Sequence, residues 1–433
     1  MARVAENGPA RSAAGRPTLA RRIGAWGRET RRYPRNVWLL LLFTLGKGIQ
    51  LSIGQVTLTL YLASIGFKSD FIGLLVGVPA IGALVAALPV GYLADRMPRK
   101  PLLLITGLLN PVSLALLGVL TNPTAMLAAA FANGVLSSAY WVTIIPMLTE
   151  AVPARQRVSV MSLNTFLLLG VGALGGLLGG AVPALVGALT GLPASSAEPL
   201  RWGVIAAAIA VFLPTAPLFW LKESQVVEPV ESEPSPAADA ALADVALTPA
   251  PALAAEAGPQ PSARPIWLLF ILLLVPDVLY TAGEGAVVAL EPLFFHLRFN
   301  LSVPLIGAIV AGGGLLIGVT ALLAPSIVRR HGKLRVITTA QLLSAPIALL
   351  IGYAPWAWLS GTAELGRNLL RGAFEPVYAT FAMERVSARY RARLSGFYSV
   401  TWSVGFSLGA AASGWLQRNV NLSIGFLLGA VLL

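Results

Sequence analysis

The sequence contains no cysteine, and only 12% of its 433 residues are charged. The absence of cysteine excludes disulfide bonds and thiolate metal sites. A charged fraction about half that of an ordinary soluble domain excludes a chain whose surface lies mostly in water. We expect the first apolar run to be a retained span rather than a secretory signal, because residues 1–35 are rich in arginine and the run lacks a small-residue cleavage site.

Hydrophobic residues make up 56% of the chain and gather in long runs. Most runs have about 20 residues, enough to cross a bilayer as a helix. The pattern predicts an all-α polytopic membrane protein with twelve spans, at residues 36–64, 70–94, 101–121, 123–149, 157–190, 200–221, 266–297, 302–328, 334–353, 355–383, 394–416 and 422–433. Since the last span is short, we expect the natural chain to continue beyond Leu433.

The net charge of +12 is unevenly divided between the two sides of the predicted spans. The first 35 residues and every second loop hold 24 of the 31 Lys and Arg, and the intervening loops hold four. Cytoplasmic loops retain positive charge, so the N-terminus is predicted to be cytoplasmic, in a bacterial-type inner membrane. The basic loops are expected to contact anionic lipids rather than nucleic acid.

Residues 223–265 interrupt the apolar pattern with Pro, Ala and scattered acids, and contain no aromatic residue. This composition predicts a disordered cytoplasmic linker. The predicted organisation is therefore a basic N-terminal tail at 1–35, a six-helix bundle at 36–222, the linker at 223–265 and a second six-helix bundle at 266–433.

The two halves match each other at an offset of 234 residues. Residues 70–77 (DFIGLLVG) align with 304–311 (PLIGAIVA), 91–100 (GYLADRMPRK) with 325–334 (PSIVRRHGKL), and 150–157 (EAVPARQR) with 384–391 (ERVSARYR). Three matches at one offset indicate an internal repeat. Two copies of six helices in the same orientation form a parallel repeat.

The segment GYLADRMPRK closes the second span with a cluster of charges. It resembles the signature loop of the major facilitator superfamily, Gly-x-x-x-Asp-Arg-x-Gly-Arg-Arg/Lys, with Pro98 at the usual glycine. Together with the repeat, the resemblance covers essentially the whole chain. It implies a carrier that works by alternating access, not an enzyme, and one without a cofactor. The alternative is an ordinary basic loop that only sets the topology.

The resemblance also implies a conformational latch between the halves on the cytoplasmic side. Asp95 ends the second span, and its carboxylate is expected to accept hydrogen bonds from the start of the eleventh helix, near Ser395 and Gly396. The repeat places Arg329 at the Asp95 position, so the second copy of the latch is predicted to be weaker. The latch residues are Gly91, Asp95, Arg96, Arg99, Lys100, Glu150, Arg157, Arg330, Glu384 and Arg391.

Ionisable side chains inside spans are costly and mark functional sites. In the resembled family the first, fourth, seventh and tenth spans line a central cavity, and here these spans hold the polar residues. We predict that substrate or protons bind at Lys47, Gln50, Gln55, Asn133, Tyr140, Trp141, Asp277, Tyr280, Glu284, Glu291, Glu364, Arg367, Asn368, Arg371 and Glu375. The residues of the seventh and tenth spans fall on one face of each helix.

Glu284 is the strongest candidate for a carboxylate that exchanges a proton. No cation lies within four residues of it on its own helix, and Lys47 is a candidate partner across the cavity. In an alternative interpretation, Glu364 with Arg367 and Arg371 with Glu375 are self-satisfied pairs that only support packing. A second alternative places Asp277 and Glu291 at the membrane interfaces.

Glycines in the fifth span, at Gly175, Gly179 and Gly180, partly resemble a motif of the antiporter branches of the superfamily. Ordinary small-residue packing is an equal alternative. We predict a monomeric secondary carrier that exports an amphiphilic or cationic small molecule in exchange for protons. Proton-coupled uptake of a small solute and a transport-inactive membrane scaffold or sensor are the alternatives.

Overall fold

The computed structural model describes residues 33–222, 266–386 and 388–433. Every element of secondary structure in these residues is a helix, and no strand occurs among them. The predicted linker and the first 32 residues of the predicted tail lie outside the described residues. The first half contains α2 (Arg35–Ser64), α3 (Ser69–Arg96), α4 (Arg99–Leu117), α5 (Pro123–Glu150), α6 (Ala154–Thr165), η1 (Phe166–Val171), η2 (Gly172–Leu174), α7 (Gly175–Thr190), α8 (Ala197–Thr215) and η3 (Ala216–Trp220). The second half contains α10 (Ile266–Val288), α11 (Glu291–Phe299), α12 (Val303–His331), α13 (Lys333–Tyr353), α14 (Ala357–Arg385), α15 (Ala388–Asn419) and α16 (Ile424–Leu432).

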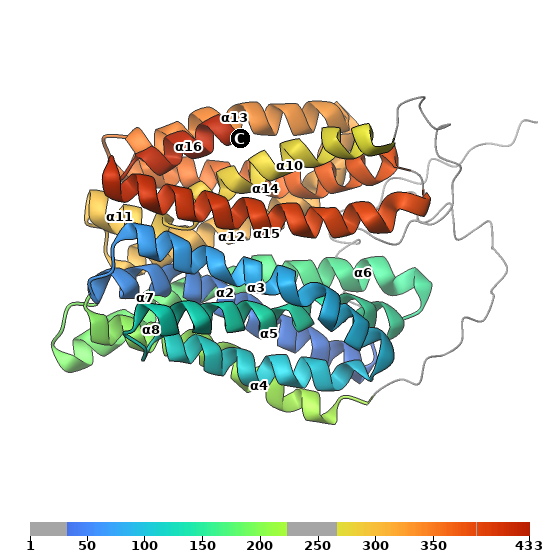
Figure 1. Ribbon diagram of the computed structural model, residues 1–433, viewed down its shortest axis with the longest axis horizontal. Coiled ribbons are helices and arrows are strands. Elements are labelled where there is room, and N and C mark those ends of the chain that lie inside the picture. Colours follow the sequence, from blue (N-terminus) through green and yellow to red (C-terminus); the bar gives the residue numbers. More distant parts are fainter. Residues whose placement is uncertain (1–32, 223–265, 387) are drawn as a thin grey trace, which may run out of the picture.

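The internal repeat is visible in where the helices begin. Four helices of the second half start 234 residues after their counterparts, at the pairs Ser69 and Val303, Arg99 and Lys333, Pro123 and Ala357, and Ala154 and Ala388. Since the same offset aligns the loop sequences, each half is one copy of the same helical unit. This confirms the predicted fold of two related bundles, which Figure 1 shows as a blue-to-green bundle below a yellow-to-red one.

Nine helical segments of the described chain are long and apolar enough to cross a membrane. The other three of the twelve predicted spans are not long or apolar enough by the same measure, each for an identifiable reason. α14 carries four charged residues in its middle, α15 begins with several arginines and is rich in serine, and α16 has only nine residues. The charges that make α14 a poor apolar segment are those of the candidate site.

Two of the predicted spans are interrupted. The fifth changes from α-helix to a π-helical turn at Phe166–Val171 and then to a 3₁₀ turn before α7 begins. A π-helical turn of this kind often lies at a functional site. The seventh breaks after Val288, and a new helix begins at Glu291.

The halves contact each other mainly along two helix pairs, α3 with α15 and α7 with α12, and α2 also contacts α11 and α12. At the end of the molecule that carries Asp70 and Arg418, here called the opposite end, this contact is close. A Cβ atom on Gly73 would lie 2.3 Å from the carbonyl oxygen of Ala410, and Ser407 Oγ donates a hydrogen bond of 2.7 Å to Gly77 O. The backbones can approach this closely because the contact positions are small.

The glycines of the fifth span pack in the same way. A Cβ on Gly176 would lie 2.8 Å from the carbonyl oxygen of Gly307, and one on Gly180 would lie 2.6 Å from Cα of Pro304. Both contacts join α7 to α12 across the interface between halves. Close packing is therefore one role of these two glycines, and the antiporter motif stays a prediction.

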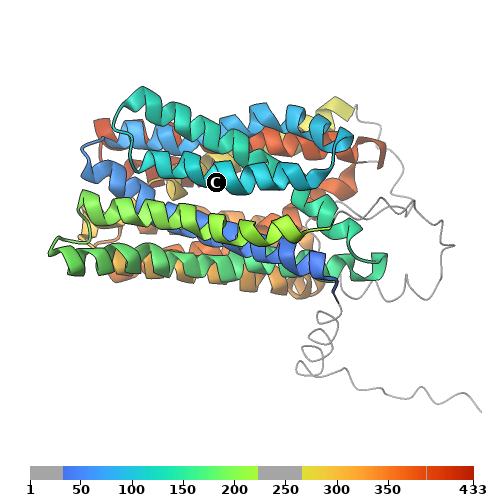
Figure 2. The same cartoon turned by 90° about the horizontal axis from the view of Figure 1, so that it is seen from below.

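At the other end, here called the basic end, the helix ends beside the α3–α4 and α12–α13 turns carry Arg96, Lys100, Arg330 and Lys333. Here α3 and α15 diverge, at the right of Figure 1, and Figure 2 shows the same helices from below. A Cβ on Gly91 or on Gly396 would meet no atom within 4 Å. A cavity of about 560 Å³ lies between the halves near this end, lined by Phe166, Leu169, Ile317, Glu375, Val377 and Lys333. The two bundles are thus joined at the opposite end and separated at the basic end.

Candidate substrate and proton site

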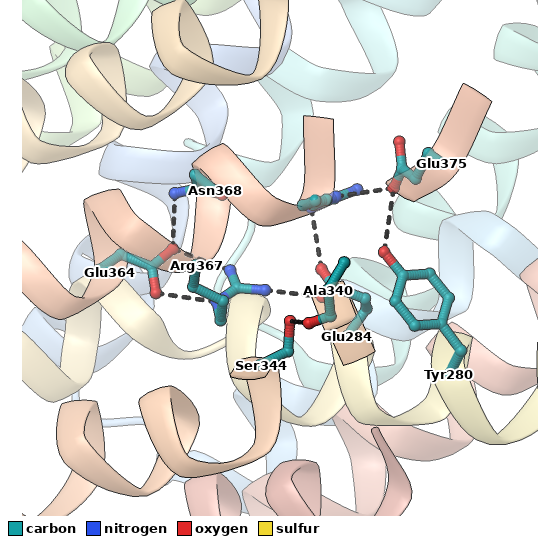
Figure 3. Close-up of polar contacts among 9 residues, drawn as sticks. Tyr280, Glu284, Ala340, Ser344, Glu364, Arg367, Asn368 and Glu375 are labelled. Atoms are coloured by element: carbon teal, nitrogen blue, oxygen red, sulfur yellow. Dashed lines mark hydrogen bonds and ion pairs between the residues drawn. The ribbon is translucent and has the colours of Figure 1, made fainter. Parts of the chain in front are cut away.

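A group of seven polar side chains in the second half is here called the charge cluster: Tyr280, Glu284, Glu364, Arg367, Asn368, Arg371 and Glu375. The cluster brings together side chains of α10 and α14 at the depth of the membrane spans (Figure 3). Spacings of three and four residues place them on one face of each helix. This much agrees with the sequence-based prediction.

Arg367 is the centre of the charge cluster and is only 1% exposed. Its Nη1 donates to Glu284 Oε1 at 2.7 Å, across from α14 to α10. Its Nη2 and Nε donate to the two oxygens of Glu364 at 2.8 and 3.1 Å. Asn368 Nδ2 donates a further bond of 2.7 Å to Glu364 Oε1. A guanidinium buried this deeply remains charged because carboxylates on two sides compensate it.

Arg371 continues the charge cluster toward the basic end. Its Nη1 lies 3.0 Å from Glu284 Oε2, and its Nε donates to Glu375 Oε1 at 2.7 Å. Tyr280 OH lies 3.5 Å from the same Glu375 oxygen. The side chain of Glu375 is 38% exposed and lines the cavity, so the charge cluster ends at the space between the halves.

Glu284 therefore has a different environment from the one that its own helix indicates. Both of its oxygens face guanidinium groups of α14, and its side chain is 7% exposed. The suggested pairing with Lys47 is not formed in this structure. Glu284 instead links Arg367 and Arg371.

Asp277 and Glu291 are both buried, so neither lies exposed at a membrane interface. Asp277 accepts a hydrogen bond from Thr401 Oγ1 and thereby joins α10 to α15. Glu291 begins α11 and is 2% exposed.

The first half contains a smaller polar group around a buried lysine. Lys47 Nζ donates to Gln50 Oε1 at 2.8 Å and to Asn110 Oδ1 at 3.1 Å. Gln50 Nε2 also donates to Asn110 Oδ1, and Asn110 Nδ2 donates to the carbonyl oxygen of Asn133. Amide groups are thus the partners of Lys47, and it makes no ion pair with any described residue.

Asn110 was missed by the sequence-based prediction because its helix, α4, was not among the expected cavity helices. The repeat offset could have pointed to it. Adding 234 carries Gln50 to Glu284, Asn110 to Ser344 and Asn133 to Arg367. Figure 3 shows Ser344 beside the charge cluster, where its Oγ donates to the carbonyl oxygen of Ala340 at 2.7 Å. The two polar groups occupy equivalent places in the two halves.

The remaining candidates of the first half lie apart from this group. Tyr140 is fully buried against Phe43, and its hydroxyl lies 3.4 Å from Thr44 Oγ1. Trp141 is 46% exposed, and Gln55 is half-buried without a hydrogen bond to a described residue. Only Lys47, Gln50 and Asn133 of the predicted first-half residues are brought together.

Several predicted latch residues form contacts within their own half. Arg99 Nη1 donates to Glu150 Oε1 at 2.5 Å, and the residues 234 positions later, Lys333 and Glu384, form the equivalent ion pair. Lys100 donates to backbone carbonyls of η3 and Leu221, and Arg157 to the carbonyl oxygen of Thr149. These bonds fix the ends of α4, α5, α13 and α14 at the basic end.

The contact expected between Asp95 and the start of α15 is not assembled. Asp95 is exposed and makes no hydrogen bond or ion pair with a described residue. Arg96 lies over the ring of Tyr92, 4.1 Å from its centroid, and Arg330 is exposed. The side chain of Arg391 lies outside the described residues. Since the basic ends of the halves are separated here, the latch stays a prediction for another conformation.

An ion pair that the sequence did not indicate joins the halves at the opposite end. Arg418 in the last turn of α15 donates to Asp70 in the first turn of α3. Among the described residues it is the one ion pair that crosses between the halves. Each charge also lies at the helix terminus that stabilises it.

Comparison with known proteins connects this architecture to a family. Residues 39–410 match the family model of the Major Facilitator Superfamily. Among curated proteins, solute carrier family 22 member 2 of Rattus norvegicus is 40% identical over 72 residues, which are 17% of this chain and 13% of the relative. Solute carrier family 22 member 1 of Oryctolagus cuniculus is 38% identical over 80 residues, 18% of this chain and 14% of the relative. The chain thus matches only about a seventh of the length of these relatives.

Solved structures resemble the chain over a much larger part of its length. A bacterial homologue of the human lysosomal transporter Spinster, in an inward-facing and unoccupied conformation, superposes with a TM-score of 0.70 over 88% of this chain and 82% of the other, at 14% identity. The nucleoside transporter NupG superposes with a TM-score of 0.63 over 92% of this chain and 96% of the other, at 17% identity. At these identities the likeness is one of fold.

Proposed function

The chain belongs to the major facilitator superfamily, and we propose that it is a proton-coupled carrier that exports an amphiphilic or cationic small molecule. Members of this superfamily are transporters rather than enzymes. The proposal concerns the coupling ion, the direction and the chemical class of the substrate. It places the protein in a bacterial-type inner membrane as a monomer, with its basic end at the cytoplasm and in contact with anionic lipids.

The observation that carries the proposal is the excess of acid in and beside the charge cluster. Three carboxyl groups, those of Glu284, Glu364 and Glu375, form ion pairs with two guanidinium groups, and Glu291 is buried without an ion pair to a described residue. Uncompensated charge at membrane depth is costly, so a site with this composition is stabilised when it binds protons or a cation. Both coupling to protons and recognition of a cation follow from the same imbalance.

The cavity supports the substrate class. Its walls include Phe166, Leu169, Ile317 and Val377. The charged side chains that line it are Arg329, Lys333, Glu375 and Glu384, and Lys333 pairs with Glu384. Glu375 Oε1 faces Arg371 and Tyr280, and its second oxygen has no hydrogen bond to a described residue. An apolar wall with one available carboxylate oxygen suits a molecule with an apolar body and a cationic group.

With the basic end at the cytoplasm, this conformation is inward-facing and ready to accept a substrate from the cytoplasm. Export and uptake use the same side chains. They differ in whether the substrate moves in the opposite direction to the protons or in the same direction. Proton-coupled uptake therefore remains the alternative that the experiment must distinguish. A transport-inactive scaffold would have no need of the acid excess.

The direct test is flux in proteoliposomes that contain the purified protein. Ethidium, a flat apolar cation, serves as the probe, and a pH gradient is imposed in either direction or omitted. We expect ethidium to move against its gradient only when protons flow the other way. Movement in the same direction as protons would support uptake, and no protein-dependent movement with this or other amphiphilic cations would contradict the proposal.

A further inference from the structure

The cavity near the basic end lies to one side of the molecule. Its lining residues belong to the fifth span (α6 and η1), to α12 and to α14, with Lys333 at the start of α13. No described residue of α2, α3, α5, α10 or α15 is among them. The cavity therefore occupies the space between α6 and α12, here called the slit. α14, which carries the buried charge cluster, closes the slit on the inside.

The slit begins where the fifth span leaves α12. A Cβ atom on Gly314 would lie 2.3 Å from Cβ of Ala173, and one on Gly318 would lie 2.8 Å from Cα of Gly170, so the helices touch at this level. α7, η2 and η1 pack against α12, whereas α6 packs against α5 and α2. From Gly318 to the basic end, the fifth span and α12 are thus separated by the cavity.

The interruption of the fifth span lies at this branching point. Helices change direction at π-helical turns, and the turn at Phe166–Val171 is where the span parts from α12. The residues 234 positions later, 400–405, lie inside the long helix α15 (Ala388–Asn419) without an interruption. The repeat by itself therefore does not create the slit, which depends on a feature of the first half.

The helices on both sides of the slit expose apolar side chains on adjoining faces. Leu174 of the fifth span and Val319 and Leu323 of α12 are exposed. Leu169 and Leu322, which line the cavity from the two sides, are themselves 36% and 40% exposed. Exposed apolar side chains on membrane-spanning helices contact acyl chains. The slit is therefore open toward the bilayer between Leu169 and Leu322.

The length of the slit matches one leaflet of the membrane. On α12 the lining residues run from Ile317 to Arg329, which is about 18 Å of helix. The hydrocarbon core of a bilayer is about 30 Å thick, so one leaflet contributes about half of that. Arg329 belongs to the basic last turn of α12, at the level of the lipid head groups. The slit thus extends from the head groups to about the middle of the membrane.

We infer that an amphiphilic molecule enters the cavity sideways, from the leaflet on the basic side through the slit between α6 and α12. The identity of this molecule rests on the proposed function, whereas the opening of the slit to lipid does not. An amphiphile dissolved in the bilayer passes between Leu169 and Leu322 with its apolar body against Phe166 and Ile317. Its cationic group then reaches Glu375 without a passage through water.

Quenching by a lipid tests the opening without a substrate. The chain has no native cysteine, so the fluorophore bimane can be attached to a single Ala379→Cys on the α14 wall of the cavity. The purified protein is placed in vesicles of phosphatidylcholine whose acyl chain carries a nitroxide, which quenches bimane on contact. We expect a loss of fluorescence at position 379 comparable with that at Val319→Cys on the lipid-facing side of α12.

Two variants of α12 show whether the lipid reaches position 379 through the slit. Leu322→Trp places a large ring at the mouth of the slit, and Val319→Trp places the same ring on the adjoining face, which does not line the cavity. We expect Leu322→Trp to reduce quenching at position 379 several-fold and Val319→Trp to leave it unchanged. Absence of quenching in the wild-type background, or equal quenching in both variants, would overturn the opening to lipid.

Transport of ethidium by the same two variants tests whether the substrate uses this route. We expect several-fold slower flux in Leu322→Trp and wild-type flux in Val319→Trp. Lipid quenching at position 379 together with equal flux in both variants would overturn the route while the opening itself stands. If the wild type moves no amphiphilic cation, the proposed function fails, and the quenching result still decides whether the slit is open to the bilayer.

Discussion

At the scale of single residues, the role of a charged side chain depends on which side chain of another helix lies beside it. Glu284 and Glu291 are seven residues apart and lie on the same stripe of the sequence, yet their surroundings differ. Glu284 forms ion pairs with two guanidinium groups, whereas Glu291 is buried without an ion pair to a described residue. We therefore expect Glu284 to act as a structural ion-pair partner.

This difference gives a prediction for Glu284→Gln. The substitution leaves Arg367 and Arg371 with one carboxylate fewer, and removing one partner of a buried ion pair costs about 3–5 kcal/mol. We expect a clearly lower thermal unfolding temperature in detergent than for the wild type. Glu198→Gln, at an exposed position, should unfold like the wild type.

A second substitution separates this role from proton exchange. In Glu284→Gln with Arg371→Gln, the excess positive charge is removed, and part of the lost stability should return. If Glu284 is instead the group that exchanges the proton, Glu284→Gln will unfold like the control and lose only proton-driven accumulation. That result would restore the role that the sequence alone indicates for Glu284.

At the scale of elements, α3 and α15 control how the halves meet. Near the opposite end their contact consists of small residues, and near the basic end the two helices separate. Gly73 and Gly91 lie on the same helix, α3, at the packed and the open part of this contact. They allow the same substitution to be compared in two environments.

We expect Gly73→Ala to disturb the contact and Gly91→Ala to be tolerated. The new Cβ at position 73 would lie 2.3 Å from Ala410 O, and overpacking of this kind costs about 1–3 kcal/mol. At position 91 no atom lies within 4 Å, and alanine favours a helix by up to about 1 kcal/mol over glycine. Thermal unfolding of both variants is the measurement. Equal effects would show that the α3–α15 contact does not hold this conformation.

At the scale of the whole molecule, α3 carries an acid at each end. Asp70 is paired with Arg418 at the opposite end, and Asp95 at the basic end has no partner among the described residues. Contacts that exist in only one conformation shift the equilibrium between conformations. The two acids should therefore favour different states of the carrier.

Asp95→Asn should leave this conformation unchanged and destabilise the one in which the basic ends meet. Loss of a charge-assisted contact of about 1–3 kcal/mol would enrich the present form roughly 5- to 150-fold. The chain has no native cysteine, so labelling of a single Ser395→Cys reporter measures how accessible the basic end is. Faster labelling in Asp95→Asn is expected, and an unchanged rate would remove Asp95 from the latch.

Asp70→Asn should act in the other direction, because it weakens the conformation seen here. The guanidinium side of this pair is half exposed, so its contribution is below about 1 kcal/mol and the shift at most roughly fivefold. A Ser407→Cys reporter, buried in the α3–α15 contact, should be labelled faster when Asp70 is replaced. Slower or equal labelling would show that this ion pair does not hold the opposite end closed.

The sequence by itself determined the class of protein, the helices and the repeat. The hydrophobicity of a segment depends only on its own residues. Segments long enough to cross a bilayer can therefore be identified from the sequence alone. The offset of 234 residues is also local information, and the helix starts confirm it. Charges placed on one face of α14 were found for the same reason, since helical spacing decides the face.

Only the tertiary structure decided which charges meet. Glu284 and Arg367 are 83 residues apart, and their contact depends on how α10 and α14 are placed in the bundle. Residue spacing does not show which side chains of different helices meet, so the sequence indicated no partner for Glu284 on its own helix and did not indicate Asn110. The suggested pairing of Lys47 with Glu284 is not formed in this conformation. Whether the Asp95 latch is closed depends on the arrangement of the two halves in the whole molecule. The sequence does not determine one arrangement, because two conformations of one chain differ in free energy by only a few kcal/mol.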